Sequence, residues 1–499
     1  MQFCPTKSES GLARPKGQAD LHSGPESDHG RDRQARNVGD LNRDGPASSA
    51  GRTGKDLPKG QTGEMGLIRP GFPADRQRGG RFARTEPGSD PRSSPISSEI
   101  EPAMLLIRLD SLRSDMTLAR PVLHPDRDDL ILLNAGYVLD EPMIQKLAEM
   151  GVTNVWIRVP GFEEVQAEAD DQISRNHMEL YRILTRSIHD LEPRVAVKLN
   201  VQQYEGAVHM MLSSIIDRPH HDVVTNELLS CGPQLTGHMA NCSYLALLLG
   251  AHLTGYLRDQ RRNLPSGVAE NTEQLGLGAL LHDIGKLNMP DELFAKTILD
   301  DEAESPEYRF HVRSGYEAVR EYLSPVAANV VLHHHERFDG NGFPGRQGPQ
   351  DETLPNIGTN IHVFSRILAV VDVFDRLLCP GGRPVPTIVA IDGLRSERFN
   401  GWFDPMIIDA LLRLVPPFMI GSVVTLRDGQ EAAVVANHPE APCKPTVRVL
   451  KEGPTGPLAS TRQLDLRMCR DLSIAEVNGV NVEPYLYAGE FEPESVSAA

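Results

Sequence analysis

The stretch GALLHDIGKLNMPDELF, residues 278–294, places three ionisable side chains inside an apolar helical pattern. The apolar positions have helical spacing and comprise Leu280, Leu281, Ile284 and Leu287. His282 and Asp283 are adjacent, so their side chains diverge by about 100° around a helix and can reach one centre or bridge two. Lys286 follows one turn later and lies over both. Burying three such groups costs free energy unless they are paired or bound to a metal ion.

A His-Asp pair taken alone has an ordinary explanation. A core histidine beside a salt bridge on the helix surface would give the same two residues. We expect Gly285 to leave the backbone beside these side chains uncovered, and Pro290 to help end the helix. The rest of the chain therefore has to decide between packing and metal binding.

A second cluster of ionisable residues occurs in VVLHHHERFDGNGFPG, residues 330–345. Three consecutive histidines after an apolar run are hard to explain by packing, and neutral imidazoles bind transition metals well. Other candidates stand alone in apolar helical patterns, namely His238, His311 and Asp372. A buried aspartate such as Asp372 requires a cation. These positions together favour metal binding over packing.

The candidate ligands are sufficient for two octahedral metal ions. They are His238, His282, Asp283, His311, His334, His335 and Asp372. Mixed imidazole and carboxylate ligands suit Fe, Mn or Zn better than Ca or Mg, which prefer oxygen ligands alone. We therefore predict a centre of two divalent metal ions that activates a water molecule for attack on a phosphate ester. In such a centre Asp283 would hold a metal and orient the nucleophile, and Lys286 would stabilise the developing negative charge.

The composition divides the 499 residues into modules. Residues 1–103 are rich in Gly, Pro, Ser, Asp and Arg and contain no Trp or Tyr, so we expect a disordered extension. An alternative is that translation begins at Met104. We expect a small α+β module at 104–162, a helical linker at 163–221, a helical domain at 222–416, a small β-barrel-like module at 417–476 and a tail at 477–499. In the β-rich module, Asp428–Gly429 between two apolar runs predicts a hairpin.

The order of these motifs resembles the HD-GYP subgroup of HD-domain phosphohydrolases, which are bacterial cyclic di-GMP phosphodiesterases. The resemblance covers about residues 222–385. It rests on HDxGK at 282–286, on HHE at 334–336 and on DGNGFP at 339–344, with His333 as an additional histidine. The resemblance implies a mainly α fold, with an all-helical HD-type metallohydrolase domain between the two smaller modules. It also implies cyclic di-GMP as substrate, pGpG or GMP as product, and Fe or Mn as the metal.

The resemblance further implies a set of residues that contact substrate. They are Lys286, Gly340, Gly342, Phe343, Pro344 and Arg383. The chain departs from the family pattern at three places. Phe343 replaces the tyrosine of the family name, and Gln234 replaces a glutamate that can hold a third metal, so we expect two metals. After Asp372 the usual Ala-Leu-Thr continuation and basic segment are replaced by RLLCPGGRPVPT, in which Arg383 and Pro384 remain.

Two alternatives to this activity stay open. The same metal centre could hydrolyse another nucleotide, such as an alarmone, a deoxynucleotide or a different cyclic dinucleotide. The chain could also be a sensor or docking protein that binds cyclic di-GMP without turnover, which the changed segment after Asp372 and the residue Phe343 would favour. Diguanylate cyclases of the GGDEF type are candidate partners, and a dimer is a candidate assembly.

Charge and cysteine content restrict the environment and the partners. The net charge of −17 disfavours non-specific binding to nucleic acid. Six cysteines without CxxC spacing argue against a disulfide framework and suit a reducing compartment. The longest apolar stretch is shorter than the roughly 20 residues that a membrane span needs, and the first thirty residues lack the apolar core of a signal peptide. We therefore expect a cytoplasmic protein without a membrane span.

Overall fold

The computed structural model describes most of the chain after residue 103. The described residues are 104–124, 127–152, 154–159, 171–189, 200–217, 235–300, 303, 305–350, 352–452 and 458–488. The expected extension at 1–103, residues 489–499 of the expected tail and Gln234 lie outside them. No helix among the described residues is long and apolar enough to cross a membrane.

The first module has the expected α+β composition. Strand β1 (Met104–Arg108) pairs antiparallel with β4 (Asn154–Arg158), and β2 (Val122–His124) pairs antiparallel with β3 (Arg127–Leu133). Helix α1 (Glu141–Glu149) begins after Asp140, whose side chain accepts a hydrogen bond from the backbone of Met143 at 2.8 Å. This N-cap together with proline in the first turn explains where the helix starts.

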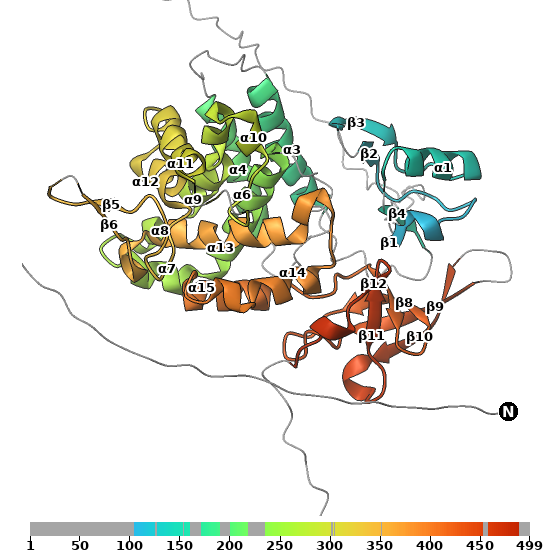
Figure 1. Cartoon of the computed structure of the whole chain (residues 1–499). Coiled ribbons are helices and arrows are strands. Elements are labelled where there is room, and N and C mark those ends of the chain that lie inside the picture. Colours follow the sequence, from blue (N-terminus) through green and yellow to red (C-terminus); the bar gives the residue numbers. More distant parts are fainter. Residues whose placement is uncertain are drawn as a thin grey trace, which may run out of the picture. The chain divides into compact units, whose positions relative to one another are not determined.

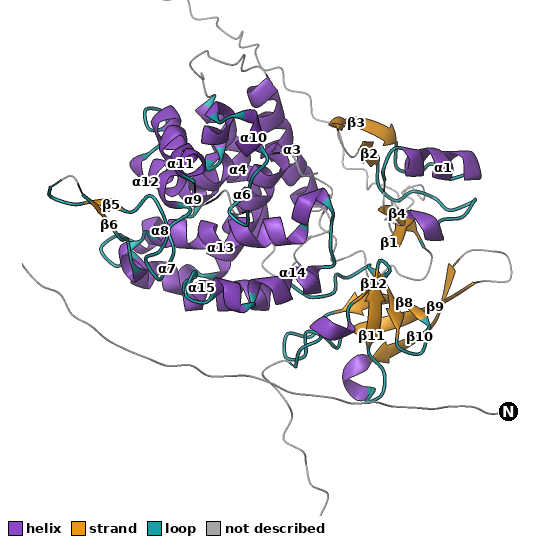
Figure 2. Cartoon of the chain, in the orientation of Figure 1, coloured by secondary structure: helices purple, strands orange, loops and turns teal. Residues whose placement is uncertain are grey.

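Helices dominate the described residues between 171 and 414 (Figures 1 and 2). They are α3 (Asp171–His189), α4 (Val201–Asp217), α6 (Leu235–His252), α7 (Thr254–Gln260), α8 (Ser266–Ala269), α9 (Glu273–Leu281), α10 (Asp291–Phe294), α11 (Pro306–Val319), α12 (Pro325–His333), α13 (Val363–Leu378), α14 (Thr387–Leu394) and α15 (Pro405–Leu414). The predicted all-helical domain is confirmed. A short hairpin of β5 (Arg346–Gln347) and β6 (Thr353–Leu354) interrupts it.

Helix α6 is the centre of this domain. Every residue from Thr236 to Gly250 is buried, so the helix is enclosed on all sides, as expected for a core helix without a polar face. Helices α3, α4, α9 and α13 pack against it. The packing of α3 and α4 differs from our expectation of a linker over 163–221. These helices contribute Leu180 and Met211 to the same hydrophobic core, because their apolar stripes face α6.

The helix at the HD motif is shorter than the sequence pattern predicts. Helix α9 ends at Leu281, and the chain continues as a 3-10 helix, η2 (Ile284–Asn288), well before Pro290. Gly285 is not an uncovered backbone position. A Cβ atom there would lie 2.0 Å from the carbonyl oxygen of His311 and 2.5 Å from the backbone nitrogen of Gly315. Gly285 therefore permits η2 and α11 to approach closely.

The C-terminal module is a six-stranded antiparallel sheet. Its strands are β7 (Val423–Leu426), β8 (Glu431–Ala436), β9 (Thr446–Glu452), β10 (Leu458–Asp465), β11 (Ile474–Val477) and β12 (Val480–Asn481). Their order is β10-β9-β8-β7-β11-β12, with β10 and β12 at the edges. The predicted hairpin at Asp428–Gly429 is confirmed, and Gly429 adopts a φ of +83°, which favours glycine.

Candidate metal centre

All seven predicted ligands lie together in the helical domain. His238 is in the first turns of α6, His311 is in α11 and Asp372 is in α13. The other four follow helix ends, His282 and Asp283 after α9 and His334 and His335 after α12. All seven side chains are buried. Residues far apart in sequence therefore form one polar cluster inside an apolar core.

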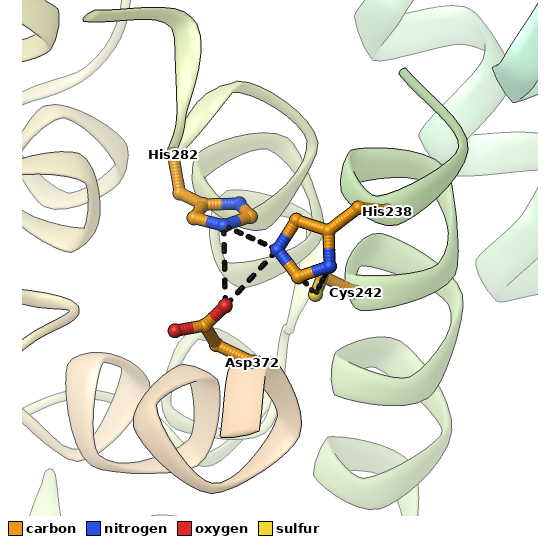
Figure 3. Close-up of side chains that lie close together, drawn as sticks. All are labelled: His238, Cys242, His282 and Asp372. Carbon is orange, nitrogen blue, oxygen red and sulfur yellow. Dashed lines mark hydrogen bonds and ion pairs between the residues drawn. The ribbon is translucent and has the colours of Figure 1, made fainter. Parts of the chain in front are cut away.

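The side chains form two groups of potential metal ligands. Group A consists of His238, Cys242, His282 and Asp372. Group B consists of Asp283, His311, His334 and His335. Within each group the candidate ligand atoms all lie within 4.8 Å of one another. Figure 3 shows group A, with side chains from α6, from the end of α9 and from α13 turned toward one another.

Three histidines are oriented by their own helices. The Nδ1 atoms of His282, His311 and His334 lie 2.8, 2.6 and 2.7 Å from the backbone carbonyl oxygen three residues earlier. A carbonyl oxygen only accepts, so each Nδ1 carries the hydrogen and each Nε2 keeps a free lone pair. The Nε2 atom is thus the atom available to bind a metal, and the backbone supplies the outer hydrogen bond that metal-ligating histidines usually make.

His238 is oriented by a carboxylate instead. Its Nδ1 lies 2.7 Å from Oδ2 of Asp375, and Oδ1 of Asp375 accepts a hydrogen bond from Asn241 at 2.8 Å. Burial and Arg376 act to lower the pKa of His238, but its hydrogen bonds to Asp372 and Asp375 outweigh them and raise it. Asp375 is not among the ligands predicted from the sequence, although its position three residues after Asp372 on α13 offered a signal.

We expect Asp375→Asn to weaken metal binding about ten- to hundredfold, the usual effect of losing an outer hydrogen bond to a ligating histidine. The amide removes the negative charge that holds the imidazole of His238. Metal affinity, measured by titration of the metal-free protein, tests this. The exposed aspartate Asp409 on α15 provides the control Asp409→Asn. Unchanged affinity in Asp375→Asn would contradict the orienting role.

Several buried atoms in the cluster have no hydrogen-bond partner within the part of the chain that the structure describes. They are Asp283 Oδ1, His335 Nε2 and Asp372 Oδ2. The Nε2 atoms of His311 and His334 face each other at 3.4 Å, and those of His238 and His282 at 3.2 Å. Lone pairs gathered in this way, with unsatisfied polar atoms between them, fit bound cations. The donor set therefore fits two divalent metal ions.

Asp283 connects the two groups. Its Oδ1 lies 3.4 Å from His311 Nε2, on the side of group B, and its Oδ2 lies 3.6 Å from His282 Nε2, on the side of group A. Oδ2 also pairs with Lys286 at 2.9 Å. Burial would raise the pKa of Asp283, but Lys286 and the neighbouring histidines hold it well below the usual value. The carboxylate is therefore ionised and available to both groups.

Lys286 is buried, and its ammonium group contacts three neighbouring residues. Besides Asp283, its ammonium donates to the carbonyl of Lys296 at 3.1 Å and lies 5.4 Å from the ring centre of Tyr308. Burial and the nearby Arg376 lower its pKa. The predicted role in stabilising charge stays a prediction, and the structure places this ammonium next to the shared carboxylate.

Two further residues of the centre were not anticipated. Arg376 contacts both Asp283 and Asp372, and its position four residues after Asp372 was the available signal. Cys242 lies one turn after His238, with its sulfur 3.7 Å from both ring nitrogens. Burial raises the pKa of this thiol well above its usual value, so it is protonated in the metal-free protein.

The glycine-rich turn at 339–344 closes against the cluster. The ring of Phe343 lies 4.9 Å from that of His335, and Phe343 packs with Tyr308 in a small apolar cluster. Gly342 leaves no room for a Cβ atom, which would lie 2.2 Å from the backbone nitrogen of Arg337. Glu336, the last residue of the HHE motif, accepts hydrogen bonds from the backbone of Gly345 and from His333. The turn is thus anchored to the histidine segment.

The remaining predicted substrate contacts lie at or near this turn, with one exception. Gly340 has a φ of +82°, and Pro344 follows Phe343 directly. Arg383 is exposed after a short 3-10 turn (Pro380–Gly382), and among the contacts of the described residues none joins it to groups A and B. Its role in substrate binding stays a prediction.

We expect the metal-free protein to lose stability as the pH falls. Burial lowers the pKa of His282 and His311 from 6.5 to about 3. Between these values the unfolded chain binds protons that the folded protein does not. The free energy of unfolding therefore decreases as the pH decreases. Each histidine contributes up to about 1.4 kcal/mol per pH unit, and His238, with its raised pKa, opposes the trend in part.

Denaturant unfolding in EDTA at about pH 7.5 and about pH 5 measures this dependence. Equal or greater stability at the lower pH would contradict it.

The arrangement of buried histidines and aspartates in a helical domain fits a metal-binding domain of the HD type. The family described as HD domain matches residues 249–407, which include every predicted ligand except His238. The family described as KOW domain associated with HD domain matches residues 423–481, the C-terminal sheet. The chain therefore carries an HD domain followed by a KOW domain of the kind associated with it, and its motifs resemble those of the HD-GYP group.

Several characterised proteins are similar to this chain. The cyclic di-GMP phosphodiesterase PA4108 of Pseudomonas aeruginosa is 30% identical over 178 residues, which cover 35% of this chain and 41% of that protein. The cyclic di-GMP phosphodiesterase response regulator RpfG of Xanthomonas campestris is 28% identical over 299 residues, 58% of this chain and 68% of the relative. The 3'3'-cGAMP-specific phosphodiesterase 2 of Vibrio cholerae is 33% identical over 115 residues, 22% of this chain and 20% of the relative.

Proposed function

We propose that this chain hydrolyses the phosphodiester bonds of cyclic di-GMP to pGpG or GMP, and thereby lowers the level of this second messenger in bacterial signalling. The observation that carries the proposal is the convergence of two buried ligand groups on the carboxylate of Asp283. The names of the relatives PA4108 and RpfG support cyclic di-GMP as the substrate.

Two divalent metal ions, Fe or Mn, are part of this proposal. Imidazole and carboxylate ligands suit these ions better than Ca or Mg. When bound, such a pair lowers the pKa of a shared water toward about 7 and neutralises phosphate oxygens. Two ions rather than three follow from the neutral Gln234, which is a poor ligand.

The residues of the chain then have separate tasks. Asp283 presents one oxygen to each ligand group and orients the nucleophile between them. Burial lowers the pKa of His282, His311 and His335, so these three histidines are neutral and can bind metal without first losing a proton. The Nζ atom of Lys286 lies 2.9 Å from Oδ2 of Asp283, where it can stabilise the negative charge that develops during attack on phosphorus.

A different cyclic dinucleotide is the second candidate substrate. Three Vibrio cholerae relatives are named 3'3'-cGAMP-specific phosphodiesterases, with 32–33% identity over short segments. A metal centre of this kind acts on the phosphodiester and does not distinguish the bases. Base recognition therefore has to come from residues outside groups A and B.

A sensor that binds cyclic di-GMP without turnover is the third candidate. It is favoured by Arg376, which occupies oxygens of two proposed metal ligands, and by Phe343 in place of tyrosine. A protein of this kind would bind the dinucleotide and leave it intact.

A turnover assay separates the three candidates. The full chain is loaded with Mn²⁺ or, anaerobically, with Fe²⁺ and incubated with cyclic di-GMP or 3'3'-cGAMP, and products are separated by chromatography. We expect faster release of pGpG or GMP from cyclic di-GMP, and its loss in His282→Ala. Faster hydrolysis of 3'3'-cGAMP would favour the second candidate, and tight binding without product the third.

Other parts of the proposal concern the cellular setting. GGDEF-type diguanylate cyclases as partners, dimer formation and a cytoplasmic location stay predictions. Pull-down of the full chain with candidate cyclases and light scattering of the purified protein would test the first two.

A further inference from the structure

Arg376 lies inside the proposed metal centre. It is on α13, one turn after Asp372, and its side chain is 12% exposed. Its Nη2 atom lies 2.7 Å from Oδ2 of Asp283, and its Nε atom lies 3.0 Å from Oδ1 of Asp372. One guanidinium therefore joins a carboxylate of group A to the carboxylate shared by both groups.

The two oxygens held by Arg376 both belong to the side of group A. Oδ1 of Asp372 lies 3.0 Å from Nε2 of His238. Oδ2 of Asp283 lies 3.6 Å from Nε2 of His282. A metal ion bound by these histidines would need the same oxygens, and a guanidinium is always charged and forms strong bonds to carboxylates. Arg376 therefore competes directly for the ligands of group A.

Group B has no such competitor. Oδ1 of Asp283 lies 3.4 Å from Nε2 of His311 and 3.7 Å from Nε2 of His334. Among the ion pairs of the described residues, only these histidines approach this oxygen, and no lysine or arginine does. Nε2 of His335 likewise has no hydrogen-bond partner in the described part of the chain. The ligands of group B are therefore free to bind an ion.

We propose that Arg376 makes the two metal sites unequal: an ion binds tightly to group B, and an ion binds weakly to group A because it has to displace the guanidinium from Asp283 and Asp372. Lys286 also contacts Oδ2 of Asp283, but it does not reach Asp372 in any described ion pair. The inference rests on the metal centre of the proposed function and does not depend on the substrate or on turnover.

Calorimetric titration of the metal-free full chain with Mn²⁺ tests the proposal. We expect two binding steps of different affinity in the wild type. Arg376→Gln keeps a polar side chain but removes the charge, so it should tighten the weaker step by about ten- to hundredfold, the scale of one charge-assisted hydrogen bond. The tighter step should change by less than about threefold, within the usual context dependence of such contacts. Two equal sites in the wild type, or an unchanged or weakened second step in the variant, would overturn the proposal.

Two further variants assign the steps. His311→Ala removes a ligand of group B and should abolish the tighter step. Loss of the weaker step instead would contradict the assignment. Arg413→Gln is the matched control, because Arg413 also pairs with an aspartate four residues away, Asp409, but on the solvent-exposed face of α15. This control should titrate like the wild type, and a tightened second step in it would also count against the proposal.

Thermal unfolding provides a second readout. Without metal, Arg376→Gln removes the positive charge that offsets the two buried carboxylates, so its Tm should fall below that of the wild type. Mn²⁺ should raise the Tm of the variant by more than it raises that of the wild type. If the metal-free variant does not stay folded, the loaded protein is exposed to increasing EDTA. The second ion should then resist removal better than in the wild type, and easier removal would overturn the proposal. Absence of phosphodiesterase activity would leave all these results standing, so the two proposals fail separately.

Discussion

Replacing Asp283 by asparagine is expected to lower the turnover of cyclic di-GMP by about a thousandfold or more, the scale seen when a central catalytic group is removed. Asparagine has almost the same shape but lacks the charge. Its amide can offer an oxygen to only one of the two ligand groups, whereas the carboxylate of Asp283 faces both. Bound metal, measured by elemental analysis, should fall together with turnover.

The substitution also changes the environment of two buried cations. Lys286 and Arg376 both pair with Oδ2 of Asp283, and breaking a buried pair costs about 3–5 kcal/mol. Thermal unfolding is therefore measured beside turnover, with Asp392→Asn on the exposed side of α14 as control. A folded Asp283→Asn protein that keeps two metal ions and near-normal turnover would refute the bridging role.

Gly285→Ala is expected to destabilise the protein by about 3 kcal/mol or more, at the upper end for overpacking. The added methyl group would lie 2.0 Å from the carbonyl oxygen of His311, and a backbone atom cannot move aside as a side chain can. Either η2 separates from α11 or His311 shifts. Both changes should also weaken metal binding in group B.

Gly206→Ala is the matched control for this substitution. Gly206 is in helix α4, and a Cβ atom there would meet nothing within 4 Å. The same chemical change should therefore stabilise the protein by about 0.4–1 kcal/mol, because alanine lowers the conformational entropy of the unfolded chain. Denaturant unfolding of both variants gives the comparison. Similar effects of the two substitutions would contradict the close approach at Gly285.

The cluster of candidate metal ligands could be predicted from the sequence because its members violate a strong local pattern. A histidine or aspartate in an apolar helix, such as His282 or Asp372, is costly to bury without a cation, so its presence carries information. Spacing also predicted most elements, including the hairpin at Asp428–Gly429 and helix α1. In these places local physics and the final fold agree.

Other features depend on contacts that no local pattern contains. The end of α9 at Leu281 and the tight packing of Gly285 follow from the position of α11. An arginine four residues after an aspartate usually forms a surface ion pair. Arg376 instead reaches Asp283 across the core, which is known only once α13 and the end of α9 are placed together. The inward faces of α3 and α4 likewise require the position of α6.

The bonds from His282, His311 and His334 to carbonyls three residues earlier have a consequence for assembly. Each imidazole is oriented by the backbone of its own helical segment, so each ligand is prepared before the helices meet. A bound ion would then act as a cross-link between segments distant in the chain, and chelation would loosen the helices from one another without disordering any single ligand within its own helical segment.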